Sequence, residues 1–281
     1  MRDRNLARSA GSPHSTVQKT KDFWWIMNLS YKWLTGLSAG TLLFLYGPIV
    51  IILVFSFNVS KIAAVWEGGT FFWYKQLAGN DSLWLAMSNS LIVGGISTLV
   101  SLGLGVSAAV ALERGRVLGQ PLLEGFLLLP LVIPEVMLGV ALLLFFVMIE
   151  WPLGLGTVTI GHCVFNLPLV VMVIRASLRR IDPVWEAAAR DLGATPWQAF
   201  VYVTFPLLRP AILGAGLMAF TLSLDDFVVT FFTTGPGATT LPLKVFSMIR
   251  TGITPEINAL SAILITVSML LIGVSLACQR K

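Results

Sequence analysis

Charged side chains are scarce in this chain. They make up 12% of its 281 residues, while hydrophobic residues make up 56%. Soluble globular domains carry roughly 25% charged residues. A soluble domain of this composition would lack the polar side chains needed to cover its surface. The composition therefore excludes a soluble fold and predicts an all-α, polytopic integral membrane protein.

Several motifs are also missing. Cys163 and Cys278 are the two cysteines, and they fall towards opposite ends of different apolar runs, so a disulfide between them is implausible. The sequence contains no glycine-rich phosphate-binding loop, no cluster with metal-ligand spacing and no internal repeat. His162 stands alone in an apolar run, and we interpret it as structural. By itself, the chain is not expected to hold a nucleotide or a metal.

Long apolar runs are abundant by contrast. Six of them are long enough to cross roughly 30 Å of hydrocarbon. They lie at about 35–57, 84–112, 122–149, 157–178, 209–233 and 256–278. The first follows a basic leader but is too long for the apolar region of a signal peptide and lacks a convincing cleavage site. It is therefore predicted to be a retained helix, the first of six.

Most of the 19 Lys and Arg residues lie in the N-terminal tail, at the C-terminus and in the loops after the second and fourth runs. The loops on the other side hold Lys61, Lys75, Lys244 and Arg250. This bias predicts that both termini are cytoplasmic. Residues 1–33 are interpreted as a cytoplasmic basic tail, disordered at first and ending in an interfacial segment rich in Trp and Lys, and residues 34–281 as the membrane domain.

The polar segment at about 182–206 contains signals for two short helices. Asp182 and Pro183 are typical of a helix start, and Gly193 is typical of a helix end. Thr195 is placed to cap a second helix, which we expect to end at Pro206. Glu186 and Arg190 are spaced to pair on the first helix, opposite an apolar face of Trp185, Ala188 and Leu192. We expect a helix–turn–helix unit that projects into the cytoplasm.

Two simpler interpretations of this segment exist. It could be a loop that only connects two spans, or a DNA-binding helix–turn–helix, which also uses a glycine turn. The DNA-binding alternative is disfavoured because both ends continue into membrane spans and the two short helices carry a single Arg. The capped, alanine-rich surface instead favours docking into a groove of a partner.

The segment "WEAAARDLGATPWQAFVYVTFP" resembles the EAA loop of bacterial ABC importer permeases. That pattern is Glu-Ala-Ala, three residues, Gly, nine residues, then Ile-x-Leu-Pro. Anchored on Gly193, its end falls on Val203 to Pro206. Its Glu position falls on Ala187, and the acidic residue stands one position earlier. The resemblance assigns ATPase coupling to Glu186, Ala187, Ala188, Asp191 and Gly193.

The resemblance extends over nearly the whole chain after about residue 34. The runs "LLLPLVIPEVMLGVALLLF", "FTLSLDDFVVTFF" and "GPGATTLPLKVFSMIRTGITPEINAL" are similar to polyamine importer permeases, and "VWEGGT" and "GATTLP" favour the putrescine branch over spermidine. The resemblance implies the type I ABC importer permease fold and a bacterial inner-membrane location. It also implies two ATPase subunits that bind ATP and Mg²⁺, a second homologous permease and an external polyamine-binding protein. It implies no cofactor on this chain, no enzyme activity and no nucleic-acid partner.

Three acidic residues lie inside apolar runs. Glu135 lies roughly 20 Å and Asp225 roughly 24 Å from the cytoplasmic ends of their spans, at 1.5 Å per residue, and Asp226 follows Asp225 directly. No Lys or Arg lies near that depth in either run, and a membrane-buried carboxylate is costly without a partner. We expect these three residues to form an acidic constriction for a cationic diamine.

Structural roles are the alternative for each acid. Neighbouring residues on a helix point about 100° apart, so both aspartates can face one point only if the helix is distorted. One of them could instead cap a broken helix or bond Thr221, Ser223 or a backbone amide. Glu135 follows Pro134 and could lie at a proline kink where freed backbone groups need partners.

Two other function classes use intramembrane carboxylates. An ion-coupled secondary transporter of a cationic substrate is the first, but such proteins usually contain duplicated halves, and none is visible in this sequence. An intramembrane hydrolase is the second, but adjacent aspartates lack the separation expected of catalytic acids on different helices.

Overall fold

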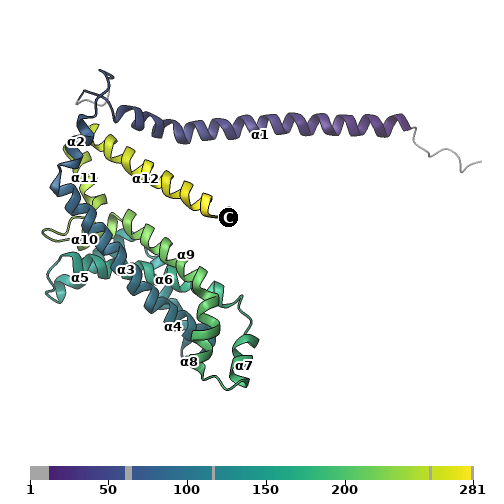
Figure 1. Ribbon diagram of the computed structural model, residues 1–281, viewed down its shortest axis with the longest axis vertical. Helices are drawn as coiled ribbons and strands as arrows, with labels where there is room; N and C mark the ends of the chain where they lie inside the picture. The colour runs from purple at the N-terminus through teal and green to yellow at the C-terminus, as the bar shows by residue number, and fades with distance from the viewer. Residues whose placement is uncertain (1–12, 61–64, 116–117, 253–254, 280–281) are drawn as a thin grey trace, which may run out of the picture. The chain divides into compact units, whose positions relative to one another are not determined.

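The computed structural model describes residues 13–60, 65–115, 118–252 and 255–279, and within them it contains helices and one isolated bridge between Asn58 and Gly69. The elements, labelled in Figure 1, are α1 (Pro13–Phe55), α2 (Phe72–Ala78), α3 (Asp81–Arg114), α4 (Gln120–Val132), α5 (Glu135–Met148), α6 (Leu155–Leu178), α7 (Val184–Asp191), α8 (Pro196–Ala199), a π-helical turn η1 (Phe200–Thr204), α9 (Phe205–Asp225), α10 (Val228–Thr233), α11 (Leu241–Thr251) and α12 (Pro255–Gln279).

Two compact units make up the chain: residues 1–74 with 255–281, and residues 75–254. In the first unit, α1 packs on α12. The sequence predicts a disordered stretch, then an interfacial segment and a membrane helix from about residue 35, but α1 already begins at Pro13, so disorder is wrong for residues 13–20. A helix grows more easily from an existing helix than it nucleates, which accounts for the extension. Residues 1–12 lie outside the described residues.

Four described helices are long and apolar enough to cross a membrane. They are Trp33–Phe55, Asp81–Arg114, Leu155–Leu178 and Pro196–Asp225. In α12, the apolar segment Pro255–Leu270 is shorter than these four helices. The all-α membrane fold is thus observed, and the count of six spans remains a prediction.

The third predicted span is not one straight helix. The chain bends by 108° between α4 and α5. Ile133 is extended, with ψ 132°, because the residue before a proline is pushed out of the helical region. The proline kink that the sequence allowed at Pro134 is therefore a full break, and Pro130 lies inside α4.

We expect the broken pair α4–α5 to make one crossing. Arg114, at the end of α3, donates to the carbonyl oxygen of Leu178 at the end of α6, so α3 and α6 end on the same side. Because α6 is long and apolar enough to cross a membrane, we expect residue 155, where it begins, to lie on the opposite side from residue 114. The segment between them would then have to cross.

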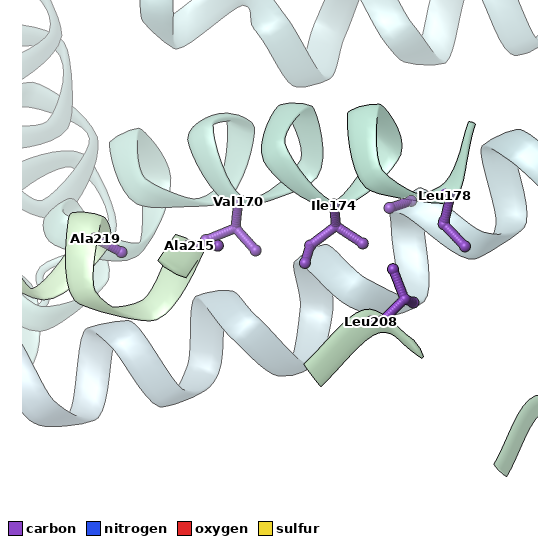
Figure 2. Close-up of a cluster of buried hydrophobic side chains, with 7 residues drawn as sticks. Val170, Ile174, Leu178, Leu208, Ala215 and Ala219 are labelled. Atoms are coloured by element: carbon purple, nitrogen blue, oxygen red, sulfur yellow. The ribbon is translucent and has the colours of Figure 1, made fainter. Parts of the chain in front are cut away.

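The core of the second unit is formed by α3, α6 and α9, which lie alongside one another (Figure 1). Figure 2 shows α6 directing its apolar side chains towards α9. The fully buried cluster comprises Ala109, Val170, Ile174, Leu178, Leu208, Ala215 and Ala219. Small residues allow this close approach: a Cβ on Gly105 would lie within 3 Å of Val170. Such packing stabilises helix contacts in a membrane, where lipid removes most of the hydrophobic driving force.

The fifth predicted span is also broken. α9 ends at Asp225, and Asp226 leaves the helical region with ψ 122° before α10 begins at Val228. α10 packs closely on α5 and α6. The two broken spans therefore bring their breaks into the same part of the unit, away from α7 and α8 (Figure 1).

Candidate functional site

A cavity of about 400 Å³ lies where the two broken spans meet. Its walls come from both sides of the α4–α5 break, from α6 and from both sides of the α9–α10 break. The lining residues are Pro130, Leu131, Ile133, Glu135, Leu138, Phe165, Leu222, Asp225, Asp226, Phe227 and Val228. All three acids predicted from the sequence thus line one cavity.

Glu135 and Asp225 are exposed, and neither makes a hydrogen bond or ion pair to any described residue. Glu135 lies in the first turn of α5, where the helix dipole favours a negative charge. Asp225 is the last residue of α9. These two carboxylates are therefore the groups in the cavity that are available to a ligand.

Asp226 is engaged differently. Its side chain is 7% exposed, and its carboxylate accepts from the backbone amides of Val229 at 3.2 Å and Thr230 at 2.9 Å, and from the Thr230 hydroxyl at 2.9 Å. These bonds satisfy amides at the start of α10, which have no partner within the helix. Of the alternatives open from the sequence, helix capping describes Asp226.

His162 is the partner of Asp226 that the sequence reasoning missed. Its ring is 1% exposed, with Nε2 3.2 Å from Asp226 Oδ2 and 2.9 Å from Thr230 Oγ1. Nδ1 lies 2.5 Å from Ser223 Oγ. A carboxylate only accepts, so with Asp226 ionised Nε2 carries a proton. His162 is structural, as predicted, but it also holds the α9–α10 break to α6.

Neither the cavity nor the His162 network has the ligand set of a metal site. Groups of three or more His, Cys, Asp and Glu side chains suited to a metal are absent from the described residues. The polar groups of this region can instead bind a cation through charge and hydrogen bonds.

The segment 182–206 forms the second candidate site. Asp182 Oδ1 accepts from the amide of Val184 at 2.9 Å. At the other end of α7, the amides of Gly193 and Ala194 donate to the carbonyls of Arg190 and Ala189, and Gly193 has φ +91°. This is the Schellman arrangement, which favours glycine. Both predicted helix signals are therefore confirmed.

The second short helix starts as predicted but does not end at Pro206. Thr195 and Gln198 form a capping box, and α8 then continues through η1 into α9. The amide of Phe205 bonds the carbonyl of Phe200 in the wide π turn. Pro206 removes one amide from this continuous helix, and the π turn directly before it opens the hydrogen-bond ladder where the proline ring would otherwise clash. The prediction of a break at Pro206 is therefore wrong.

The residues assigned to ATPase coupling divide into two groups. Ala187, Ala188, Asp191 and Gly193 are exposed. Trp185 and Leu192 on the apolar face are 62% and 91% exposed.

Glu186 is turned inward: its side chain is 15% exposed, and Oε1 accepts from Thr204 Oγ1 at 2.8 Å and from Arg114 Nε at 3.2 Å. The predicted pair with Arg190 is not formed.

Residues 101–280 match the family model for the binding-protein-dependent transport system inner membrane component. The chain belongs to this family. Its relatives are named as permease proteins of transport systems, not as enzymes. The putrescine transport system permease protein PotI of Escherichia coli K12 is 43% identical over 229 residues, covering 79% of this chain and 82% of the relative.

A second family permease from the same organism, the spermidine/putrescine transport system permease protein PotC, is 37% identical over 237 residues, which cover 84% of this chain and 90% of the relative. Among solved structures, a chain of a bacterial ABC transporter that imports alginate has a TM-score of 0.68 at 20% identity, covering 91% of this chain and 96% of that one. A chain of a bacterial alginate transporter in complex with its pentasaccharide-bound periplasmic protein also has a TM-score of 0.68, at 19% identity. The predicted ABC importer permease fold is thus confirmed.

Proposed function

We propose that this family permease is one of two permease subunits of an ATP-driven polyamine importer, with putrescine as the favoured substrate. The observation that carries the proposal is the pair of unpaired carboxylates, Glu135 and Asp225, in the cavity where two spans are broken. The similarity to the putrescine permease over most of both chains supports the choice of substrate.

The chemistry of the cavity fits a short alkyl diammonium ion. The described residues that line the cavity include no Lys or Arg, so a cationic ligand would supply the charge that the two carboxylates lack. Phe165, Phe227 and Leu138 offer apolar surface for a methylene chain, and an aromatic face also attracts an alkylammonium group. Asp226 contributes by holding the α9–α10 break in place.

The complex required by this proposal contains two ATPase subunits that bind ATP and Mg²⁺, a second homologous permease and a polyamine-binding protein outside the membrane. Segment 182–206 would dock on an ATPase through the exposed face of Trp185, Ala188 and Leu192. The bias of Lys and Arg supports a cytoplasmic position for this segment and for both termini.

Uptake of labelled putrescine and spermidine tests the proposal, in cells that lack their own polyamine importers and carry this chain with its partner subunits. Asp225→Asn and Glu135→Gln should each lower the apparent affinity for diamine about tenfold or more, because each removes one charged partner. Glu67→Gln is the control, because it neutralises an exposed acid outside the cavity.

Normal uptake by the double variant Asp225→Asn/Glu135→Gln, with the complex assembled, would remove the cavity from the proposal. Uptake that follows an ion gradient while ATP stays high would favour a secondary transporter instead. Transport of neither polyamine by the assembled wild-type complex would overturn the substrate assignment.

A further inference from the structure

Arg114 lies at the last position of α3 and contacts two other elements. Its Nη2 donates to the carbonyl oxygens of Ile181 at 3.0 Å and Leu178 at 3.4 Å. Its Nε donates to Glu186 Oε1 at 3.2 Å. One guanidinium group therefore binds the carbonyls at the end of α6 and the carboxylate of α7 together. Its planar set of donors makes this possible, whereas a lysine ammonium lacks that geometry.

Glu186 extends the contact to a fourth element. The same oxygen, Oε1, accepts from the hydroxyl of Thr204 at 2.8 Å. Thr204 is 1% exposed and is the last residue of η1, directly before α9. We call Arg114, Glu186 and Thr204 the α7 anchor. It joins α7 to the ends of α3, α6 and α9, the three helices that form the core of the unit.

The α7 anchor matters because α7 has little else to hold it. None of its residues is buried, and its apolar residues Val184 and Trp185 are 65% and 62% exposed. In the anchor, by contrast, the side chains of Arg114 and Glu186 are 22% and 15% exposed. Charge-assisted hydrogen bonds with little access to water are stronger and more directional than exposed ones. The anchor is thus the principal polar link between α7 and the core helices.

We propose that Arg114 is a positioning residue for coupling: through the α7 anchor, a partner that displaces α7 displaces α3, α6 and α9 as one body. The proposal rests on the proposed function for the existence of an ATPase partner, but it does not depend on which substrate is carried. It also gives Glu186 an internal role and leaves Trp185, Ala188 and Leu192 as the surface for the partner.

The purified complete importer in proteoliposomes tests the proposal through two rates, ATP hydrolysis and substrate import. Arg114→Gln and Glu186→Gln should each raise the ATP hydrolysed per substrate imported about tenfold, since each removes one charge of the ion pair and leaves the other charge without its partner. ATP hydrolysis without binding protein or substrate should rise as well, because the ATPases then close without moving the core helices. Arg180→Gln is the control: it removes an exposed positive charge at the same end of the unit and should leave both rates unchanged.

A milder pair of variants keeps the test valid if Arg114→Gln does not assemble. Thr204→Val removes only the hydroxyl that binds Glu186, and Thr204→Ser retains it. The Val variant should shift the ratio in the same direction as Arg114→Gln, and the Ser variant should behave like the wild type.

Hydrogen exchange of the α7 amides separates coupling from simple helix capping. If Arg114→Gln exchanges its α7 amides faster but keeps the wild-type ratio of ATP hydrolysed to substrate imported, Arg114 is only a cap for α6 and α7, and the proposal is overturned. A wild-type ratio in both Arg114→Gln and Thr204→Val would overturn it as well. If the wild-type complex carries neither polyamine, the proposed substrate fails, while the rise in unstimulated ATP hydrolysis still decides the role of the anchor.

Discussion

Asp225 and Asp226 are adjacent, yet the structure gives them separate tasks. Asp225 is exposed in the cavity, whereas Asp226 caps α10 and contacts His162. The sequence indicated that two neighbouring aspartates can face one point only if the helix is distorted, and it left open whether one of them caps a broken helix. That choice depends on Ser223, Thr230 and His162, and His162 is far from both aspartates in sequence. Its isolation indicated a structural role without naming its partner.

At the residue scale, Asp226→Asn should destabilise the protein, whereas Asp225→Asn should not. An amide in place of the carboxylate presents a donor to at least one of the groups that now donate to Asp226. Leaving a buried donor unpaired costs about 1–3 kcal/mol. Thermal unfolding of the purified complex, followed by intrinsic fluorescence, would measure the difference. Equal midpoints for the two variants would contradict the capping role of Asp226.

Three of the helix ends in the polar segment 182–206 were predictable, while the breaks inside apolar runs were only partly so. The caps at Asp182, Gly193 and Thr195 follow from local backbone chemistry, and the structure contains all three. The break at Asp226 carries no proline or glycine signal, and the two aspartates were compatible both with a constriction and with a helix cap. At Pro134 the sequence allowed a kink, but its angle of 108° depends on how α5 packs against α10. Such tertiary contacts cannot be inferred from a local pattern.

At the scale of the element, Gly193→Val should disrupt the end of α7 and uncouple ATP hydrolysis from transport. With φ +91°, a β-branched residue at this position is strained, whereas asparagine tolerates positive φ better. We therefore expect Gly193→Asn to retain more coupling than Gly193→Val, with both variants still inserted in the membrane. The ratio of ATP hydrolysed to substrate imported measures this order. Full coupling in the Val variant would show that the Gly193 turn does not matter for transmission.

For the whole molecule, composition and the loop motif were enough to predict the class. Scarce charge predicted a membrane protein, and the segment ending at Pro206 led to the family that the comparisons support. The cavity was less accessible: Glu135 and Asp225 were chosen because they lack cationic neighbours in sequence, but only the fold brings the two breaks together. The inward position of Glu186 was also hidden, since its partner Arg114 lies on another helix.

The bent pair α4–α5 allows the membrane topology to be tested, because hydropathy alone does not distinguish one broken span from a re-entrant loop. Arg114 donates a hydrogen bond to the carbonyl oxygen of Leu178, so both residues lie on the same side of the membrane. We therefore expect α4 and α5 together to cross the membrane once between Arg114 and Leu155. Alkaline phosphatase, which is active only outside the cytoplasm, should therefore be active when fused after Glu150 and inactive when fused after Arg180. A fluorescent protein at the C-terminus should fold and fluoresce in the cytoplasm, as the positive-inside bias predicts. If α4 and α5 instead formed a re-entrant loop, the fusion after Glu150 would be inactive, and α3 and α6 could no longer run side by side in the same direction.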